Sequence, residues 1–422
     1  MAEPAHVYLV VPTGAVHPMT GGGQRTRILF DVLRTIHPVT VVLLGVPEDT
    51  DAGIFFPGAA RVVGLPVRSF DIYATGRIGK VLKIVRRVCL PRADMAAEPD
   101  LKARLDGMTR KGGRSIVVFR YYLTFARSGL TDESDADRRV IVDVDDRDDR
   151  KMAIQLRSRL GAGAGSLAAR ALTSRVRSLM TKRLRAAGHV WVAKEEDLFA
   201  ASDLNQSVVP NVPFASEQAK AIGPAGEGKS VMFIGGAGHM PNRQGVLWFL
   251  KNCWPRVHAA VPDAIFKIVG FGDWAEVASR YGDTPGVRIV GTVDNLPDAY
   301  SDARVVVCPI REGAGSQIKV IEGCAYARPV VATTLSGSGF GREIAAAIEP
   351  VDEADAFAEK CISYLRDAAA ATSKGNMLQN MQRRYYSRAS VTTRIAEDLA
   401  GGLSVVPAKG PNRHRSDSPS SV

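Results

Sequence analysis

Short runs of apolar residues alternate with segments of helical spacing along most of the chain. In the first half, strand-like runs occupy residues 6–11, 39–45, 115–119, 139–144 and 189–193. In the second half, where the alternation is cleaner, they occupy residues 230–236, 264–270, 287–291, 304–309 and 328–334. Amphipathic segments such as 24–36 and 245–260 separate many of these runs. Strands that alternate with helices predict βαβ units and parallel sheets covered on both faces.

A stretch rich in proline, glycine and alanine at residues 210–230 divides the chain into two halves. We therefore predict an α/β fold of two doubly wound, Rossmann-like parallel-sheet domains, at residues 1–212 and 213–385. A helix at about residues 386–404 could complete the first domain. The polar residues 405–422 lack a core-forming pattern, and we expect a disordered tail there. Ligands of such sheets bind at the carboxyl ends of the strands, so the predicted site is the cleft between the domains.

The charge of the chain is concentrated in two segments. The 422 residues carry a formal net charge of +11. Eleven basic residues stand against two acidic ones between Arg147 and Arg185, and residues 76–92 interleave basic with apolar positions. Such segments suit an anionic membrane surface as well as they suit an ordinary solvated helix face. Neither segment carries the stacking aromatic residues of a nucleic-acid reader, so we expect no nucleic-acid partner.

Targeting and cysteine patterns favour a cytoplasmic protein, and the basic segments are compatible with a peripheral position at the inner face of the membrane. No apolar run approaches the ~18 residues of a membrane-spanning helix. The first residues lack the cationic region of a signal peptide. The five cysteines are widely spaced and form no C-x-x-C pair, which predicts reduced thiols and neither disulfides nor zinc.

The stretch "PIREGAGSQIKVIEG" at residues 309–323 follows a predicted buried strand. Pro309 ends that strand, and Gly313 and Gly315 let the main chain approach a ligand closely. A helix that begins near Ser316 would point its free N–H groups at an anion such as a diphosphate.

Two charged side chains follow on this predicted helix. Lys319 could add a positive charge to the anion site, and Glu322 lies three residues further on the same face. The alternative is an ordinary helix start in which Lys319 and Glu322 form a solvent-exposed ion pair. Spacing alone favours neither interpretation.

The longer segment "PIREGAGSQIKVIEGCAYARPVVATTLSGSGF" resembles the signature of glycosyltransferase family 4, also called group 1. Upstream, "GGAGHMPNRQGVLWFLKNCWPRVHAAVPDAIFKIVG" resembles the start of the same family's C-terminal domain, and "GVRIVGTVDNLPDAYSDARVVVCPI" resembles the joining segment. The pattern "PN…WF…WP…PDA…IVG" is similar to the sugar transferases of bacterial exopolysaccharide systems. The resemblance is strongest over residues 231–340. It implies the GT-B fold, in which two Rossmann-like domains face each other across the active-site cleft.

The resemblance also implies roles for single residues. Glu322 matches the second glutamate of the family's E-x7-E motif, which holds the ribose, and Arg243 and Lys319 would bind the leaving diphosphate. The implied nucleotide-binding set comprises Gly21, Gly22, Gly23, Gly313, Ala314, Gly315, Ser316 and Glu322. Ala314 departs from the family, because it stands where the first glutamate of the motif would lie.

The N-terminal half adds two groups of candidates. The Gly21–Gly23 triplet follows the first predicted strand, and a glycine loop there would let the main chain approach the donor phosphates, with charge from Arg25 or Arg27. Asp143, Asp145 and Asp146 end a predicted strand, where they could orient an acceptor hydroxyl. The spacing of Asp143 and Asp145 also resembles the D-x-D metal motif of the GT-A architecture. A complete second α/β domain favours GT-B, so we expect no metal.

The resemblance implies an enzyme that transfers a sugar from a nucleotide-diphosphate donor to a hydroxyl acceptor, with retention of configuration and without a cofactor. The acceptor would be a glycan or a lipid-linked molecule in bacterial polysaccharide or glycan biosynthesis. Two alternatives stay open. One is a sugar-nucleotide epimerase on the same fold. The other is a non-catalytic sugar-nucleotide-binding protein of a polysaccharide assembly system, which the alanine at position 314 favours.

Overall fold

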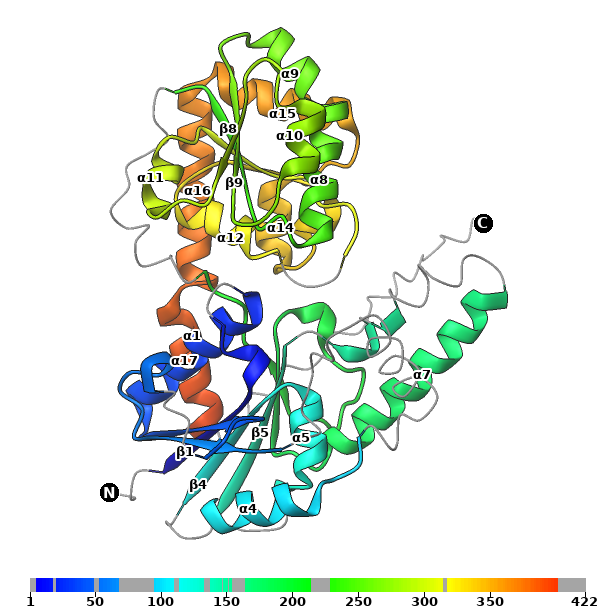
Figure 1. Cartoon of the computed structure of the whole chain (residues 1–422), viewed down its shortest axis with the longest axis vertical. Helices are drawn as coiled ribbons and strands as arrows, with labels where there is room; N and C mark the ends of the chain where they lie inside the picture. Colours follow the sequence, from blue (N-terminus) through cyan, green and yellow to red (C-terminus); the bar gives the residue numbers. More distant parts are fainter. Residues whose placement is uncertain are drawn as a thin grey trace, which may run out of the picture.

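The chain folds into two α/β domains that lie one above the other (Figure 1). The computed structural model describes residues 5–17, 20–48, 53–67, 95–109, 114–132, 137–145, 147–150, 152–153, 164–213, 228–313 and 317–400. The N-terminal domain contains a seven-stranded sheet and the C-terminal domain a five-stranded sheet. Neighbouring strands pair in parallel in both sheets. The prediction of two doubly wound, Rossmann-like domains is confirmed.

The N-terminal sheet has the strand order β3-β2-β1-β4-β5-β6-β7. Its strands are β1 (His6–Pro12), β2 (Val39–Leu44), β3 (Arg61–Leu65), β4 (Ser115–Arg120), β5 (Arg138–Asp145), β6 (His189–Val192) and β7 (Gln206–Val208). Val10 and Val42 pack into the core on one face of the sheet, while Leu9 and Val41 pack into the core on the other. Both faces are covered, so the strands read as continuous apolar runs.

Four α-helices of this domain are α1 (Gly21–Ile36), α4 (Pro99–Thr109), α5 (Tyr122–Ser128) and α7 (Ala164–Leu184). The short 3-10 turns are η1 (Thr13–Ala15), η2 (Gly53–Phe55) and η5 (Glu195–Asp197). The first helix begins earlier than predicted, because the Thr20 hydroxyl caps it and accepts a hydrogen bond from the Gly23 amide at 3.1 Å. The glycine triplet, predicted as a loop, is therefore the first turn of α1.

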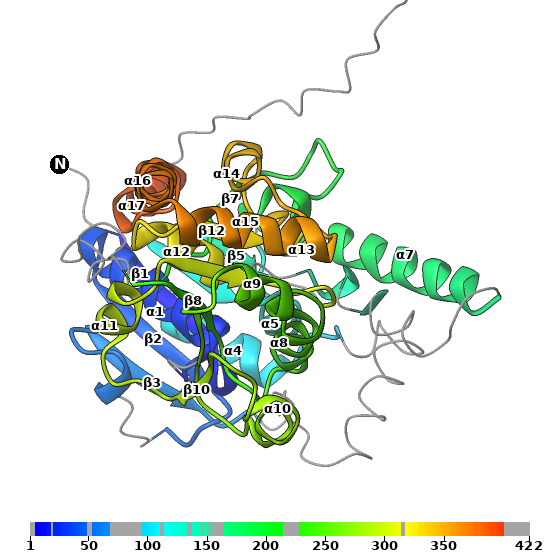
Figure 2. The ribbon, with the colours of Figure 1, turned by 90° about the horizontal axis from the view of Figure 1, so that it is seen from above.

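Helix α7 projects away from the rest of the N-terminal domain, as the two perpendicular views show (Figures 1 and 2). Its buried positions, Thr173, Val176 and Met180, recur at helical spacing and face the domain core. In the part of the chain that the structure describes, no helix is both long and apolar enough to cross a membrane.

The C-terminal sheet has the order β10-β9-β8-β11-β12. Its strands are β8 (Ser230–Ile234), β9 (Ile265–Val269), β10 (Val287–Gly291), β11 (Val305–Cys308) and β12 (Val330–Ala332). The helices are α8 (Met240–Asn252), α9 (Trp254–Ala260), α10 (Ala275–Tyr281), α11 (Leu296–Ser301), α12 (Ile318–Ala325), α13 (Thr334–Gly337), α14 (Arg342–Ile348), α15 (Ala354–Arg366) and α16 (Ala368–Tyr385). One hydrophobic core joins the sheet to α8, α9, α12 and α15.

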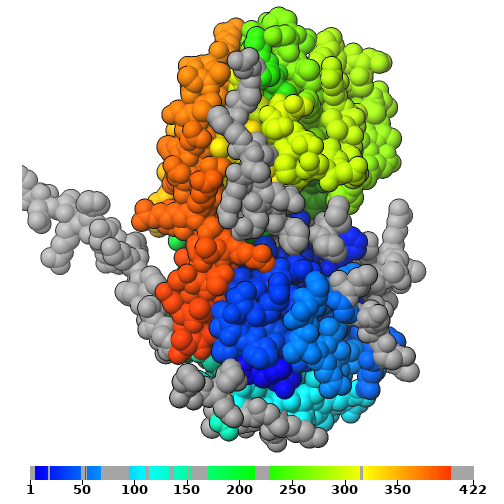
Figure 3. Space-filling model, turned by 90° about the vertical axis from the view of Figure 1, so that its left-hand side faces the viewer, coloured from blue at the N-terminus to red at the C-terminus, as the bar shows by residue number. Residues whose placement is uncertain are grey.

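The last described helix, α17 (Arg388–Ala400), returns the chain to the N-terminal domain. Val391, Ile395 and Leu399 follow one another at intervals of four residues and belong to the same core as β1. Asp398 accepts a hydrogen bond from the Trp191 indole at 2.8 Å, which fixes α17 to β6. Helices α16 and α17 together form one side of the molecule that spans both domains (Figure 3).

Candidate functional site

A cavity of about 480 Å³ lies between the two domains, at the carboxyl ends of both sheets. Its N-terminal wall contains Gly21, Gly22, Gln24, Asp145 and Asn211. Its C-terminal wall contains residues that follow β8, β9 and β10 and the first residues of α12. In the C-terminal sheet, β8 and β11 are the neighbours at which the strand order reverses, which is where open α/β sheets bind ligands. The volume is within the usual range of small-molecule sites.

Three helices direct their N-termini at this cavity. Helix α1 begins at Gly21, α8 follows His239, and α12 begins at Ile318, and these three residues line the cavity. The starts of α1 and α12 lie close together across the domain boundary, since a Cβ atom added at Gly21 would be in ordinary contact with Ile318 Cδ1, at 3.6 Å. The dipole of each helix places about half a positive charge at its N-terminus, so together the three helix starts favour an anion.

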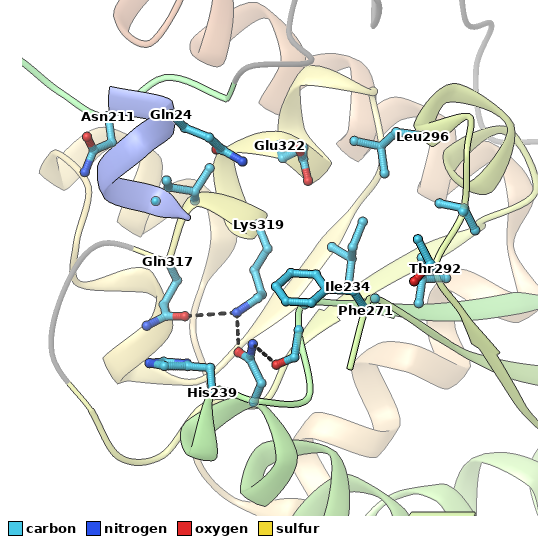
Figure 4. A pocket seen from close by; sticks show the side chains of 18 of the residues that line it. Gln24, Asn211, Ile234, His239, Phe271, Thr292, Leu296, Gln317, Lys319 and Glu322 are labelled. Atoms are coloured by element: carbon cyan, nitrogen blue, oxygen red, sulfur yellow. Dashed lines mark hydrogen bonds between the residues drawn. The ribbon is translucent and has the colours of Figure 1, made fainter. Parts of the chain in front are cut away.

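The Lys319 ammonium is held at this end of the cavity by neutral amides (Figure 4). Its Nζ donates to Asn242 Oδ1 at 2.8 Å and to Gln317 Oε1 at 3.1 Å. Asn242 is fixed in turn, because its Nδ2 donates to the Gly236 carbonyl at 2.9 Å. Residue 235 must be glycine, since a Cβ atom there would lie 2.7 Å from Asn242 Nδ2. Among the described residues, no carboxylate forms an ion pair with Lys319, so its charge is available to a ligand.

Glu322 lines the same cavity one turn further along α12. Its Oε2 accepts a hydrogen bond from the Tyr300 hydroxyl at 3.0 Å, and the Tyr300 ring stacks on Tyr326 with centroids 4.1 Å apart. Burial raises the pKa of Glu322 to about 7, against smaller opposing effects of Tyr300 and Lys319. Near neutral pH this side chain can therefore either accept a hydrogen bond from a ligand hydroxyl or donate one.

The opposite end of the cavity is mostly apolar. It is lined by Ile234, Val269, Phe271, Val293 and Leu296, with the polar Thr292 and Asp294 on either side of Val293. The Phe271 side chain is 44% exposed, and its ring lies against Gly236, where a Cβ atom would come within 2.9 Å of Cζ. Figure 4 shows Lys319, Gln317 and His239 on one side of the cavity and Thr292 and Leu296 on the other. The cavity thus suits a ligand with an anionic part and a flat, less polar part.

A buried network of charges supports the N-terminal wall. Asp143 is fully buried and accepts hydrogen bonds from Arg25 Nε at 3.0 Å and from Arg120. Arg25 also donates to the Val209 carbonyl at 2.7 Å and to Asn211 Oδ1 at 3.0 Å, which fixes the segment after β7 to α1. Burial lowers the pKa of Arg120, but Asp143, Tyr121 and Asp145 together more than offset this effect, and the net shift of the pKa is upward. These charges neutralise one another inside the protein.

Asp145 is the carboxylate of this network that reaches the cavity. Its Oδ2 accepts a hydrogen bond from Arg120 Nη2 at 3.1 Å. Its backbone has a φ of 58°, a value that residues other than glycine rarely adopt. Arg120 Nη2 also donates to the Gly22 carbonyl at 3.1 Å. A Cβ atom on Gly22 would collide with the Tyr121 hydroxyl, so the Tyr121 ring can pack this closely against α1 only with glycine at position 22.

The predicted site residues fall into three groups. Those that line the cavity are Gly21, Gly22, Asp145, Lys319 and Glu322. Those that the structure places elsewhere are Gly23, Gly313, Asp143 and Arg243. Ala314, Gly315, Ser316 and Asp146 lie outside the described residues.

Two of these placements correct the sequence interpretation. Asp143 cannot orient an acceptor hydroxyl, because two guanidinium groups occupy its oxygens and no part of it is exposed. Arg243 turns away from the cavity and pairs with Glu276 at 3.2 Å. Arg25, considered as an added charge for the phosphates, is buried against Asp143.

Other residues of the site were missed from the sequence: His239, Asn242, Phe271, Tyr300 and Gln317. Asn242 could have been predicted as a site residue, because it follows a proline at the start of a helix, and that helix comes directly after a strand and a glycine-rich turn. Tyr300 carried none, since its contact with Glu322 joins residues 22 positions apart in the sequence.

The family comparison matches only the C-terminal domain of the chain. Residues 228–367, which contain α8 with Asn242 and all of α12, match the family model described as "Glycosyl transferases group 1". No curated protein matches the sequence.

Solved structures match nearly the whole chain at low identity. The Anabaena protein Alr3699/HepE, solved in complex with UDP, is 12% identical with a TM-score of 0.58, over 94% of this chain and 100% of that chain. A glycosyltransferase from Rickettsia africae is 12% identical with a TM-score of 0.59, over 96% and 100%. An E. coli structure bound with UDP-2-fluoro glucose is 11% identical with a TM-score of 0.55, over 94% and 99%. The chain therefore has the two-domain, Rossmann-like GT-B fold.

Proposed function

We propose that the protein is a glycosyltransferase that moves a sugar from a nucleoside diphosphate to a hydroxyl group of an acceptor. The observation that carries this proposal is the polar end of the cavity, where Lys319 meets the N-termini of α1, α8 and α12. That end lies in the segment that matches group 1 glycosyl transferases. The similar fold of proteins solved with UDP or a UDP-sugar supports a uridine nucleotide as the first donor to test.

The two ends of the cavity fit the two ends of such a donor. The diphosphate would lie against Lys319 and the helix N-termini, where positive charge is concentrated. The nucleoside would extend toward Phe271 and Leu296, with the ribose hydroxyls at Glu322. This orientation leaves the sugar near Gly21, Gly22 and the N-terminal domain.

The chemical step that we propose breaks the bond between the anomeric carbon and the diphosphate oxygen, which leaves with both electrons. The acceptor oxygen forms the new bond to the anomeric carbon, and its proton passes to an oxygen of the departing diphosphate. The sugar keeps its configuration because both events occur on the same face. Lys319 and the helix N-termini stabilise the negative charge that develops on the leaving group, in place of a metal or another cofactor.

Asp145 is the residue of the N-terminal wall that we assign to the acceptor side. It faces the cavity from the end of β5, opposite Lys319, and Arg120 holds its carboxylate at 3.1 Å. A fixed carboxylate can accept a hydrogen bond from the attacking hydroxyl and orient it. A glycan or lipid-linked acceptor would provide such a hydroxyl in bacterial polysaccharide or glycan synthesis.

The basic face of α7 supports a place for the enzyme at the cytoplasmic surface of a membrane. The sequence of α7 contains no acidic residue, and Arg170, Arg175 and Lys182 are exposed. Each basic residue near an anionic lipid surface contributes about 1 kcal/mol to binding. Sedimentation with vesicles that contain phosphatidylglycerol tests this part of the proposal.

The first experiment is a thermal-shift screen against UDP- and GDP-sugars, because a ligand at 100 times its Kd adds about 2.7 kcal/mol of stability. Transfer to acceptor hydroxyls is then measured for the wild type, Lys319→Ala and the control Arg243→Ala. We expect Lys319→Ala to lower turnover roughly 10²–10³-fold. Arg243→Ala should keep most activity, because its guanidinium points to Glu276. Equal activity of the Lys319 variant and the wild type would refute the site.

Product analysis separates this proposal from its two alternatives. A transferase releases the nucleoside diphosphate and forms a new glycoside only when an acceptor is present. An epimerase converts the donor without an acceptor and without release of the diphosphate. A non-catalytic binding protein shows the thermal shift but no product.

A further inference from the structure

The cavity that we propose for a nucleoside diphosphate has little fixed positive charge. Among its described lining residues, Lys319 is the only side chain that is cationic by nature, whereas Asp145, Asp294 and Glu322 are acids. A diphosphate carries more than one negative charge and several acceptor oxygens. One lysine and the helix N-termini therefore leave part of this charge without a side-chain partner.

His239 is in the right place to supply that partner. It lies directly before α8, lines the cavity and is exposed. Figure 4 places its ring next to Gln317, at the same end of the cavity as Lys319. An imidazolium at this position would face the same ligand atoms as the Lys319 ammonium.

We propose that His239 is a second, proton-dependent cation of the diphosphate site, which becomes protonated when the nucleotide binds and donates a hydrogen bond to a phosphate oxygen. This inference rests on the proposed function. Its geometric basis is the placement of His239, directly before α8, and of Lys319, in the first turn of α12, at the same end of one cavity that both residues line.

The electrostatics of the free cavity keep the imidazole neutral. Partial burial of the imidazole, which is still accessible from the cavity, and then the Lys319 ammonium lower the pKa of His239, with a smaller opposing effect of the Asn242 side chain. The other titratable groups that face this space are Glu322 on α12, Asp145 at the end of β5 and Asp294 after β10. A bound diphosphate cancels the repulsion by Lys319 and raises the pKa again. Nucleotide binding should therefore take up a proton near neutral pH.

The sign of the pH dependence follows from this linkage. Because the complex binds more protons than the free protein, the affinity for the nucleotide falls as the pH rises between the two pKa values of His239. One linked proton changes the affinity by up to about tenfold per pH unit in that interval. Glu322 titrates in the same range, so the test must separate it from His239.

Calorimetric titration with UDP and with GDP, in buffers of different ionisation enthalpy, measures the protons taken up. The proteins to compare are the wild type, His239→Gln, His239→Arg and Glu322→Gln. We expect proton uptake in the wild type and in Glu322→Gln, and its loss in both His239 variants. His239→Arg should bind the nucleotide at pH 8 at least as tightly as the wild type does at pH 6, because its charge is permanent. Thermal unfolding confirms that each variant is folded.

Three results are decisive. Proton uptake in His239→Gln equal to that of the wild type would overturn the inference and leave the proposed function intact. Weaker binding by His239→Arg than by His239→Gln at pH 8 would also overturn it. If the wild type binds neither UDP nor GDP, the proposed function fails, and this inference fails with it.

Discussion

Both walls of the cavity contain cationic side chains, but the two domains use these charges differently. In the C-terminal domain, Lys319 is held by the neutral amides of Asn242 and Gln317. In the N-terminal domain, Arg25 and Arg120 are held by the carboxylate of Asp143. Both groups lie at the carboxyl ends of strands in Rossmann-like sheets. Only the first leaves a net charge directed at the cavity.

The comparison indicates what makes a charged residue of such a site functional. A cation with neutral partners is oriented by the protein but keeps its attraction for an anionic ligand. A cation with a buried carboxylate partner has lost that attraction and serves to stabilise the local structure. The sign of the charge is the same in both walls, so the partner decides the role of each side chain.

The largest effect that this comparison predicts is on folding. Arg120→Ala leaves the fully buried Asp143 with one guanidinium fewer and removes the hydrogen bonds to Asp145 and Gly22. We expect a loss of about 3–5 kcal/mol in the free energy of unfolding, the usual cost of removing one partner of a buried ion pair. Urea unfolding measures it.

The matched control is Arg185→Ala, because Arg185 pairs with Asp203 at 2.6 Å on the surface with both side chains about half exposed. That pair should be worth about 0–1 kcal/mol. If the two variants lose similar stability, the N-terminal network is not the structural element described here.

A smaller effect tests the C-terminal wall. Asn242→Asp gives Lys319 a carboxylate partner of the same shape at the position now 2.8 Å from its ammonium. We expect the affinity for UDP to fall at least tenfold, which is a loss of about 1.4 kcal/mol of binding free energy, because the aspartate then neutralises the lysine charge inside the protein.

Asn242→Ala is the informative comparison, since it removes the positioning of Lys319 but leaves its charge free. The comparison of the two walls requires that the aspartate variant bind UDP more weakly than the alanine variant. If shape and positioning were all that mattered, the order would be reversed. Calorimetric titration of the two variants decides between these outcomes.

Much of the fold was predictable from the sequence because it follows from local pattern. The order of apolar runs and helical segments requires βαβ units, and these place residues after β8, β9 and β10 at one edge of a sheet. For the same reason Lys319 and Glu322 could be assigned to a site from their position after a buried strand.

Partners that are distant in the sequence could not be predicted. Asp143 appeared to be a cleft carboxylate, yet it is neutralised by Arg25, 118 positions away. Arg243 and Asn242 are neighbours on α8, and one residue turns a helix by about 100°. Only one of them can therefore face the cavity, and the sequence spacing did not show which.

The smallest predicted effect concerns the close fit of Gly22 and Tyr121 in the N-terminal wall. A Cβ atom on Gly22 collides with the Tyr121 hydroxyl and has its next contact with the Cζ atom of the same ring at 3.6 Å. Gly22→Ala should therefore cost about 1 kcal/mol of stability, because the Tyr121 ring must move at a residue whose backbone is already strained, with a φ of 70°.

In a Tyr121→Phe background the hydroxyl is absent, and the alanine Cβ atom at position 22 can be accommodated. Alanine is the better helix former by about 0.8–1 kcal/mol, so there Gly22→Ala should stabilise the protein. A double-mutant cycle followed by thermal unfolding measures this change of sign, and a cost that persists in the Tyr121→Phe background would show that the glycine is needed for another reason.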